Sequence, residues 1–202
     1  MACHGLESCL VAALSLLAFI SLFRGATQDS DDYPNIARLS NSWINVNQEI
    51  IYYSDEALTV LPILGVKSKG AGFCFGFYCR NSRDECLLAV VIYHLASHSS
   101  SVGYPRLVWS ANRNTPVRVN ATLQLTEGGD LILKDADGKF VWSSNTTWKS
   151  VSGLKLTEAW NVVLFDANNA TVWQSFDHPT DALLHGQKMV SGKKLTAKLS
   201  RR

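Results

Sequence analysis

Four side chains that commonly take part in hydrolysis lie close together near the C-terminus of this 202-residue chain: Ser175, Asp177, His178 and Asp181. A serine nucleophile is usually presented on a strained strand-to-helix turn with the sequence Gly-x-Ser-x-Gly, which the chain lacks. Pro179 restricts the backbone in the middle of the group and favours a tight turn. We therefore interpret these residues as a structural corner. The chain also lacks the Val-Ala-Ile-Lys, His-Arg-Asp and Asp-Phe-Gly sequences of protein kinases, and we expect no enzymatic activity.

Two further patterns could hold a metal or a phosphate. His94 and His98 would share one face of a helix, but they lie in or beside a loop rich in serine and glycine. The glycines of Gly70–Gly72 lead into an aromatic strand, whereas a phosphate-binding loop must lead into the N-terminus of a helix. We therefore expect no metal and no cofactor.

Three cysteines follow the N-terminal region, at Cys74, Cys79 and Cys86. Residues 73–79 alternate aromatic and small side chains as a strand does, so Cys74 and Cys79 would lie about 16 Å apart along it. A disulfide needs Cα atoms within about 7 Å. The six polar residues between Cys79 and Cys86 would close a hairpin and bring these two together. A Cys79–Cys86 disulfide with Cys74 as a buried thiol is favoured, and a Cys74–Cys86 bond is the alternative.

A repeat organises the second half of the chain. Residues 125–142 and 156–173 align without a gap at an offset of 31, and each unit is a strand, a turn and a strand that ends in Val-Trp. A third unit, from the strand at 73–79 to Trp109, lies upstream. Trp109, Trp142 and Trp173 thus mark one position in each unit. Because one hairpin is barely stable alone, we expect the units to pack around a shared axis and bury these indoles together.

Composition and the N-terminus suggest a secreted globular protein. Hydrophobic residues make up 47% of the chain and charged ones 18%, and a net charge of +2 argues against nucleic acid as a partner. The apolar run from Leu10 to Phe23 is typical of a signal peptide, expected at 1–26, and no later segment could span a membrane. We expect a flexible segment at 27–39 and a basic tail at 191–202. Three sequons support secretion, at Asn120, Asn145 and Asn169.

A family resemblance is carried by motifs in a fixed order: Phe75-Gly-Phe-Tyr78, Val108-Trp-Ser-Ala-Asn-Arg113, Gly129-Asp-Leu-Ile-Leu133 and Val172-Trp-Gln-Ser-Phe-Asp-His-Pro-Thr-Asp181. Over residues 40–190 the chain resembles the bulb-type, mannose-specific lectin domain of monocots. It is most similar to the form found at the extracellular end of plant G-type lectin S-receptor-like kinases. The resemblance implies an all-β β-prism II with pseudo-threefold symmetry, made of three antiparallel four-stranded sheets.

Bulb lectins bind mannose through a Gln-x-Asp-x-Asn-x-Val-x-Tyr motif whose members share one face of a strand. The upstream unit shows no match, and neither downstream unit has the Gln or the Asp. The residues at the remaining positions are Asp130 and Ile132 in the first downstream unit, and Asn161, Val163 and Phe165 in the second. Each lost polar partner removes about 1–3 kcal/mol from a site of this kind. We expect carbohydrate binding to be weak or altered.

The sequence therefore favours a non-catalytic extracellular recognition module that binds a glycan or a protein ligand. The alternative is a truncated ectodomain of an S-domain receptor-like Ser/Thr kinase, which would lie at the plasma membrane. A transcript that stops after Arg202 would support the first, and one that continues toward a kinase the second. Pairing of exposed sheet edges would give a homodimer.

Overall fold

Strands form the body of the part of the chain that the structure describes. The computed structural model describes residues 33–46, 51–52, 58–68, 71–80, 85–94, 105–180, 182–189, 191–192 and 195, and these residues form thirteen strands and a short 3-10 helix at Ser175–Asp177. The signal peptide expected at 1–26 lies outside these residues, as does most of the expected basic tail. None of the helices in the described ranges is long and apolar enough to cross a membrane.

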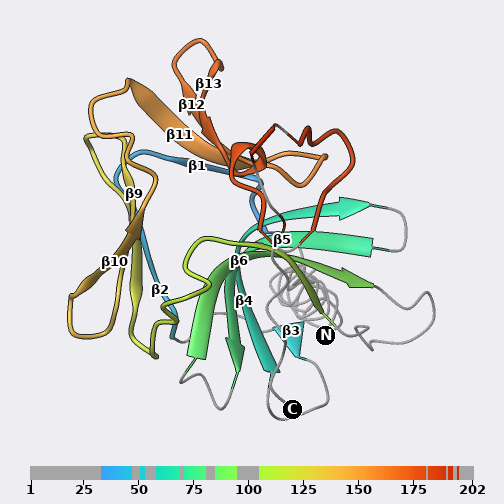
Figure 1. Cartoon of the computed structure of the whole chain (residues 1–202). Helices are drawn as coiled ribbons and strands as arrows, with labels where there is room; N and C mark the ends of the chain where they lie inside the picture. The colour runs from blue at the N-terminus through green and yellow to red at the C-terminus, as the bar shows by residue number, and fades with distance from the viewer. Residues whose placement is uncertain are drawn as a thin grey trace, which may run out of the picture. The chain divides into compact units, whose positions relative to one another are not determined.

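The upstream unit forms an antiparallel sheet of five strands in chain order (Figure 1). Its strands are β3 (Ile51–Tyr52), β4 (Leu58–Ser68), β5 (Ala71–Arg80), β6 (Glu85–His94) and β7 (Arg106–Ser110). The sequence predicted four strands in each sheet. The additional strand is the two-residue β3, which pairs with Val60 and Thr59 at the sheet edge.

The two downstream units form four-stranded antiparallel sheets. One has the order β10-β9-β8-β2, with β2 (Asn41–Ile44), β8 (Thr122–Leu125), β9 (Leu131–Lys134) and β10 (Phe140–Ser143). The other has the order β1-β11-β12-β13, with β1 (Ile36–Arg38), β11 (Val151–Leu156), β12 (Val162–Asp166) and β13 (Thr171–Gln174). Three antiparallel sheets, one from each unit, make this an all-β prism, as predicted.

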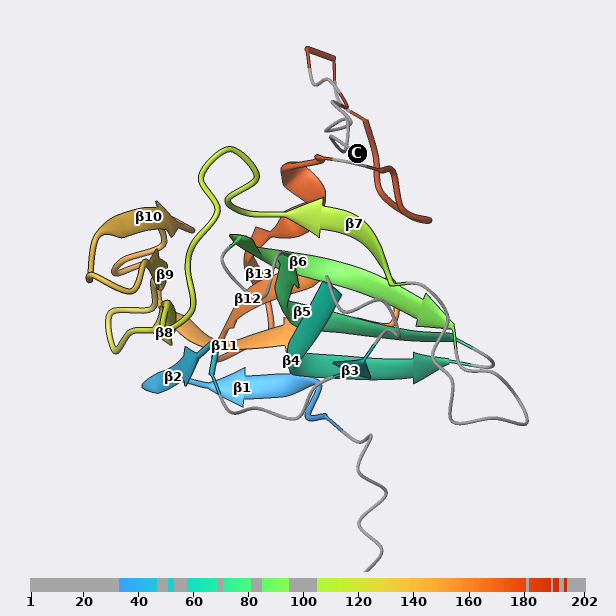
Figure 2. The ribbon, with the colours of Figure 1, turned by 90° about the horizontal axis from the view of Figure 1, so that it is seen from below.

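The first two strands join the two downstream sheets. β1 pairs with β11 and β2 pairs with β8, although only Leu39 and Ser40 separate them (Figure 2). The chain turns there through Ser40, whose φ of 59° lies in the left-handed region. The paired body therefore begins four residues before residue 40, where the sequence placed the start of the domain. A three-residue strand is too short to show the alternation that would separate it from a flexible segment.

Side chains from all three sheets form one hydrophobic core. Along β9, Leu131 and Leu133 are buried in this core, whereas Ile132 is half-buried and Lys134 is exposed. The period-2 alternation of a strand explains the difference. The five-stranded sheet differs because its other face is also buried, in a second cluster that includes Val60, Tyr78 and Val91.

A disulfide ties the hairpin of β5 and β6. Cys79 and Cys86 are direct cross-strand partners with Cα atoms 4.0 Å apart, and they are bonded, which is the pairing that the sequence favoured. Cys74 is a buried free thiol, as expected, and burial raises its pKa to about 12. At neutral pH it stays protonated and unreactive.

Candidate functional site

Asp130, which takes the place of the motif asparagine in the first downstream unit, is held inside a corner of the fold and is only 6% exposed. Its Oδ1 accepts hydrogen bonds from Ser144 Oγ at 2.8 Å and from the Thr146 backbone N–H at 3.1 Å. Its Oδ2 accepts from Ser143 Oγ at 2.7 Å and from Thr147 Oγ1 at 3.2 Å. Both carboxylate oxygens are therefore already occupied by donors of the same chain.

The charge of Asp130 follows from this arrangement. Burial alone would raise the pKa of the carboxyl, but the hydrogen bonds from Ser143, Thr146, Ser144 and Thr147 outweigh burial and lower the pKa below its ordinary value. The group is therefore a carboxylate at neutral pH, and its negative charge strengthens the hydrogen bonds that hold this corner together.

Asn161 occupies the matching place in the second downstream unit, 31 residues later. Its Oδ1 accepts from Ser175 Oγ at 3.0 Å and from the Phe176 backbone N–H at 3.2 Å, and its Nδ2 donates to Gln174 Oε1 at 2.8 Å. Ser175 and Gln174 align with Ser144 and Ser143 of the first unit. The two units therefore build one corner with different chemistry, a carboxylate in the first and an amide in the second.

The same backbone amide is capped in all three units. Ser144 Oγ accepts a hydrogen bond from the N–H of Leu131, and Ser175 Oγ accepts one from the N–H of Val162, both at 3.0 Å. In the upstream unit Asn112 Oδ1 accepts from the N–H of Leu88 at 2.8 Å. The capping residue follows the unit's tryptophan by two positions downstream and by three upstream. Sequence alignment without gaps did not reveal this third corner.

The turn before each motif position is also shared. Asp130 N donates to Thr126 Oγ1 and Asn161 N donates to Thr157 Oγ1. The residue just before each lies in the left-handed region: Gly129 with φ 81° and Trp160 with φ 66°. This conformation is costly for tryptophan, and the Trp160 ring stacks on Phe73 at a centroid distance of 4.0 Å.

The other three motif positions, Ile132, Val163 and Phe165, are half-buried or buried. Val163 is 3% exposed and Phe165 is 5% exposed, and the Phe165 ring is covered by Arg38 and Lys155 at 5.6 and 4.9 Å from its centroid. Ile132 is half-buried on the other downstream sheet. The five candidate residues thus lie on two separate sheets, three on or beside β12 and two on or beside β9.

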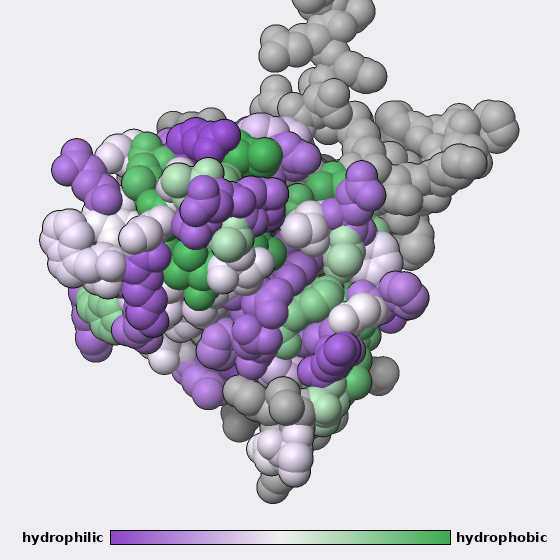
Figure 3. Space-filling model, turned by 90° about the horizontal axis from the view of Figure 1, so that it is seen from above, coloured by the Kyte–Doolittle hydropathy of each residue, from purple (hydrophilic) through white to green (hydrophobic). Residues whose placement is uncertain are grey.

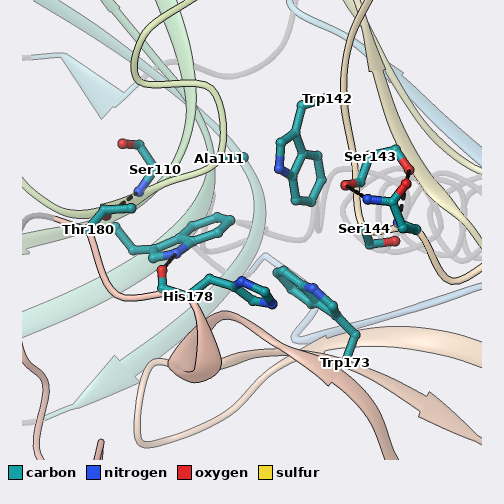
Figure 4. A pocket seen from close by; sticks show the side chains of 10 residues that line it. Ser110, Ala111, Trp142, Ser143, Ser144, Trp173, His178 and Thr180 are labelled. Carbon is teal, nitrogen blue, oxygen red and sulfur yellow. Dashed lines mark hydrogen bonds between the residues drawn. The ribbon is translucent and has the colours of Figure 1, made fainter. Parts of the chain in front are cut away.

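The three repeat tryptophans do meet, as the sequence predicted. The ring centroids of Trp109, Trp142 and Trp173 are 5.8 to 6.4 Å apart, and each pair meets edge to face (Figure 4). Trp109 is buried, whereas the other two are half-buried. They therefore form one end of the core and at the same time the wall of a cavity.

This cavity has a volume of about 320 Å³. Besides the three indoles it is lined by Ser110, Ala111, Ser143, Ser144, Asn145, His178 and Thr180. The segment after Trp173 forms one wall of it: Trp109 Nε1 donates to the His178 carbonyl at 2.8 Å, and the Ser110 N–H donates to Thr180 Oγ1 at 3.1 Å. The His178 ring stacks on Trp173 at 5.4 Å (Figure 4). No local pattern in the sequence pointed to these contacts between segments about 70 residues apart.

The three sequon asparagines occupy similar turns. Asn120, Asn145 and Asn169 are all exposed, and their φ angles of 71°, 55° and 62° lie in the left-handed region, which asparagine tolerates well. Asn145 is the member of this set that lines the cavity. Across the described ranges, no three His, Cys, Asp or Glu side chains cluster in a way that could hold a metal ion.

Comparison with known proteins finds a matching family model, similar sequences and a similar solved structure. The family model described as D-mannose binding lectin matches residues 106–201. EP1-like glycoprotein 4 of Arabidopsis thaliana is 52% identical over 189 residues, which are 93% of this chain and 40% of that protein. The epidermis-specific secreted glycoprotein EP1 of Daucus carota is 55% identical over 87 residues, 43% of this chain and 22% of that protein.

A G-type lectin S-receptor-like serine/threonine-protein kinase of Arabidopsis thaliana is 35% identical over 133 residues, 64% of this chain and 14% of the kinase. Among solved structures, a monomeric monocot mannose-binding lectin from Gastrodia elata aligns with a TM-score of 0.39 at 19% identity, covering 70% of this chain and 96% of that one. The chain spans two fifths or less of the length of these curated relatives. The family match identifies a D-mannose binding, bulb-type lectin domain at residues 106–201 of this chain, and Trp109, Trp142 and Trp173 all lie within it.

Proposed function

We propose that this chain is a secreted, non-catalytic recognition module of the bulb-lectin type in which neither downstream motif strand binds mannose. The second half of the proposal rests on one observation: the polar atoms of Asp130 and Asn161 already make hydrogen bonds within the chain. A sugar hydroxyl would have to displace Ser143 or Thr147 from Asp130, or Gln174 from Asn161. Each displacement leaves a polar group of the protein without its partner, which costs about 1–3 kcal/mol.

Two features of the chain support an extracellular site of action. All three sequon asparagines are exposed in turns, where they are accessible to modification, and a disulfide joins β5 and β6. The carrot relative is named as a secreted glycoprotein. We expect the protein in the apoplast. Recovery of a tagged full chain in apoplastic wash fluid, with a mass that falls on enzymatic deglycosylation, tests this part of the proposal.

A glycan array and mannose titration by NMR test the ligand. We expect no chemical-shift change with methyl α-mannoside at millimolar concentration, because the motif positions are occupied or buried. Binding at the motif would instead shift resonances of Ile132, Val163 or Phe165, and that result would overturn the proposal. If the array shows binding of another glycan and the resonances of Ile132, Val163 and Phe165 do not shift, recognition takes place on another surface. That result agrees with the proposal.

The similarity to a receptor-like kinase favours a second candidate, in which these residues serve as the outer domain of a membrane-anchored receptor. The binding properties proposed above are the same in both cases, since they depend on the lectin domain alone. Full-length transcript sequencing distinguishes them, because a receptor requires an apolar span and a kinase in the same reading frame.

A homodimer stays a prediction. Large apolar side chains are exposed on the edge strands, namely Ile36 on β1, Ile44 on β2 and Phe140 on β10. On the face drawn in Figure 3, however, hydrophobic side chains lie in small groups between hydrophilic ones. Light scattering of the purified chain would detect a dimer, and Phe140→Lys should disrupt one that uses the β10 edge.

A further inference from the structure

The tryptophan cavity offers unpaired donors as well as apolar walls. Among the described residues, the indole N–H groups of Trp142 and Trp173 donate no hydrogen bond, whereas Trp109 Nε1 is paired with the His178 carbonyl. Both rings are half-buried, and neither nitrogen is among the buried unpaired atoms of the described residues, so these two N–H groups are accessible from solvent. The cavity therefore combines aromatic surface with two donors that a bound polar molecule could use.

The chemistry of the lining matches a sugar ring. Small-molecule pockets of about 300–1,000 Å³ are typically walled by apolar and aromatic groups with a few converging polar groups, and this cavity of about 320 Å³ lies at the lower end of that range. A pyranose has C–H faces that can pack on indoles and hydroxyl edges that can accept from N–H donors. Thr180 Oγ1, which accepts from the Ser110 N–H, keeps its own hydroxyl proton for donation.

One attachment point for a sugar lies on the cavity itself. Asn145 begins the sequon Asn145-Thr-Thr, is exposed, and lines the cavity beside the tryptophans. Its side chain is held only loosely, since Nδ2 approaches the Ser143 carbonyl at 3.5 Å. The first ring of an N-linked glycan is bonded directly to this nitrogen and so starts at the cavity. Asn120 and Asn169 do not line the cavity.

We infer that the N-linked glycan of Asn145 seats its first sugar ring in the tryptophan cavity and covers Trp142 and Trp173. Tethering makes weak contacts sufficient, because a short covalent link gives the ring an effective concentration in the millimolar range or higher. The glycan then acts as a structural part of the domain, unlike glycans at the other two sequons. This inference concerns the chain's own modification and does not depend on what ligand the domain recognises.

Footprinting of the full chain secreted from plant cells tests the inference. Glycopeptide mass spectrometry measures occupancy at each sequon, and hydroxyl-radical oxidation measures the accessibility of each tryptophan. In the Asn145→Asp variant we expect the oxidation of Trp142 and Trp173 to rise severalfold, with Trp43 as the internal reference. Aspartate tolerates the left-handed backbone as asparagine does, so the turn is kept.

Two matched controls lie in the same chain. Asn120→Asp and Asn169→Asp replace asparagines of similar φ away from the cavity and should leave Trp142 and Trp173 protected. An unglycosylated Asn145, or an equal rise in oxidation in all three variants, would overturn the inference.

Trimming the glycan provides a second measurement on the unmutated protein. An endoglycosidase that leaves a single N-acetylglucosamine on Asn145 should preserve the protection, and complete removal should abolish it. Added N,N′-diacetylchitobiose should restore protection only after removal. If the free disaccharide further protects the glycosylated protein, the cavity is open to solution and the attached ring does not fill it, which contradicts the inference.

Discussion

The Asp130 corner and the Asn161 corner are two solutions to the same problem. Asp130 and Asn161 lie 31 residues apart in equivalent units, and each follows a Thr-Glu-x-x turn. Each accepts a hydrogen bond from a serine that caps the next strand. They differ in one atom of the central side chain. The carboxylate accepts from four different residues on its two oxygens, whereas the amide accepts from two and donates to one.

The difference shows that two equivalent positions of the repeat can hold different polar side chains when their hydrogen-bond partners differ with them. In each unit the residue after the tryptophan suits the central side chain. The Ser143 hydroxyl donates to the Asp130 carboxylate, and the Gln174 amide oxygen accepts from the Asn161 amide N–H. The pairs Asp130 with Ser143 and Asn161 with Gln174 are therefore matched. Exchanging one member without the other should expose this dependence.

Asp130→Asn should have the largest effect. The amide nitrogen replaces an acceptor and faces hydroxyl or backbone donors, so we expect the free energy of unfolding to fall by about 2–3 kcal/mol. Chemical denaturation of the secreted full chain measures the change. A loss below about 0.5 kcal/mol would show that water or rotated hydroxyls replace the carboxylate easily, and would contradict the matching of Asp130 with Ser143.

Asn161→Asp is the reciprocal change and should cost less, about 1–2 kcal/mol. Ser175 and Phe176 can still donate to the new carboxylate, and only the Nδ2 bond to Gln174 is lost. Gln174 can turn its amide to donate instead, at the expense of its bond to Asp177. The same denaturation experiment applies, and a loss larger than that of Asp130→Asn would reverse the ranking of the two corners.

Acid should narrow the difference between the wild type and Asp130→Asn. The pKa of Asp130 is lowered in the folded protein, so the carboxylate contributes stability above the ordinary aspartate pKa of about 3.9 and loses it as the pH falls through the folded value. The amide of the variant does not titrate. Unfolding curves of both proteins at pH 6 and pH 3 measure the difference between their free energies of unfolding. A difference that is the same at both pH values would show that the charge of Asp130 does not cause the loss of stability in the variant.

The smallest effects are expected for the partner residues, Ser143 beside Asp130 and Gln174 beside Asn161. Ser143→Ala removes a 2.7 Å hydrogen bond to the Asp130 carboxylate and the bond that Ser143 Oγ accepts from the Asn145 N–H, and should cost about 1–1.5 kcal/mol. Gln174→Ala removes a neutral hydrogen bond with Asn161 and an exposed one to the Asp177 carboxylate, and should cost about 0.5–1 kcal/mol. Thermal unfolding resolves such differences when both variants are measured side by side. Equal losses in the two variants would contradict the larger contribution expected from the bond to the buried Asp130 carboxylate.

Much of the fold follows from patterns within short segments. The 31-residue repeat, the alternation of residues 73–79 and the polar loop between Cys79 and Cys86 are patterns of the sequence itself, and they predicted the strands, the meeting of the tryptophans and a disulfide across β5 and β6. Two features were not predicted. β1 has only three residues, which is too few to show a period. Asn112 takes the role of the capping serine but lies one position later after its tryptophan, so an alignment without gaps does not find it.

The sequence by itself determined which residues occupy the motif positions, because order and spacing are enough for an alignment. Only the tertiary structure decided which way those residues face and whether they are covered. Asp130 and Asn161 turn inward because serines about 14 residues away reach them, and Phe165 is covered by cations of β1 and β11. Likewise, the sequons fix three candidate asparagines, but only the packing of three sheets places Asn145 on the tryptophan cavity. Burial depends on neighbours that are distant in the chain, which no local pattern records.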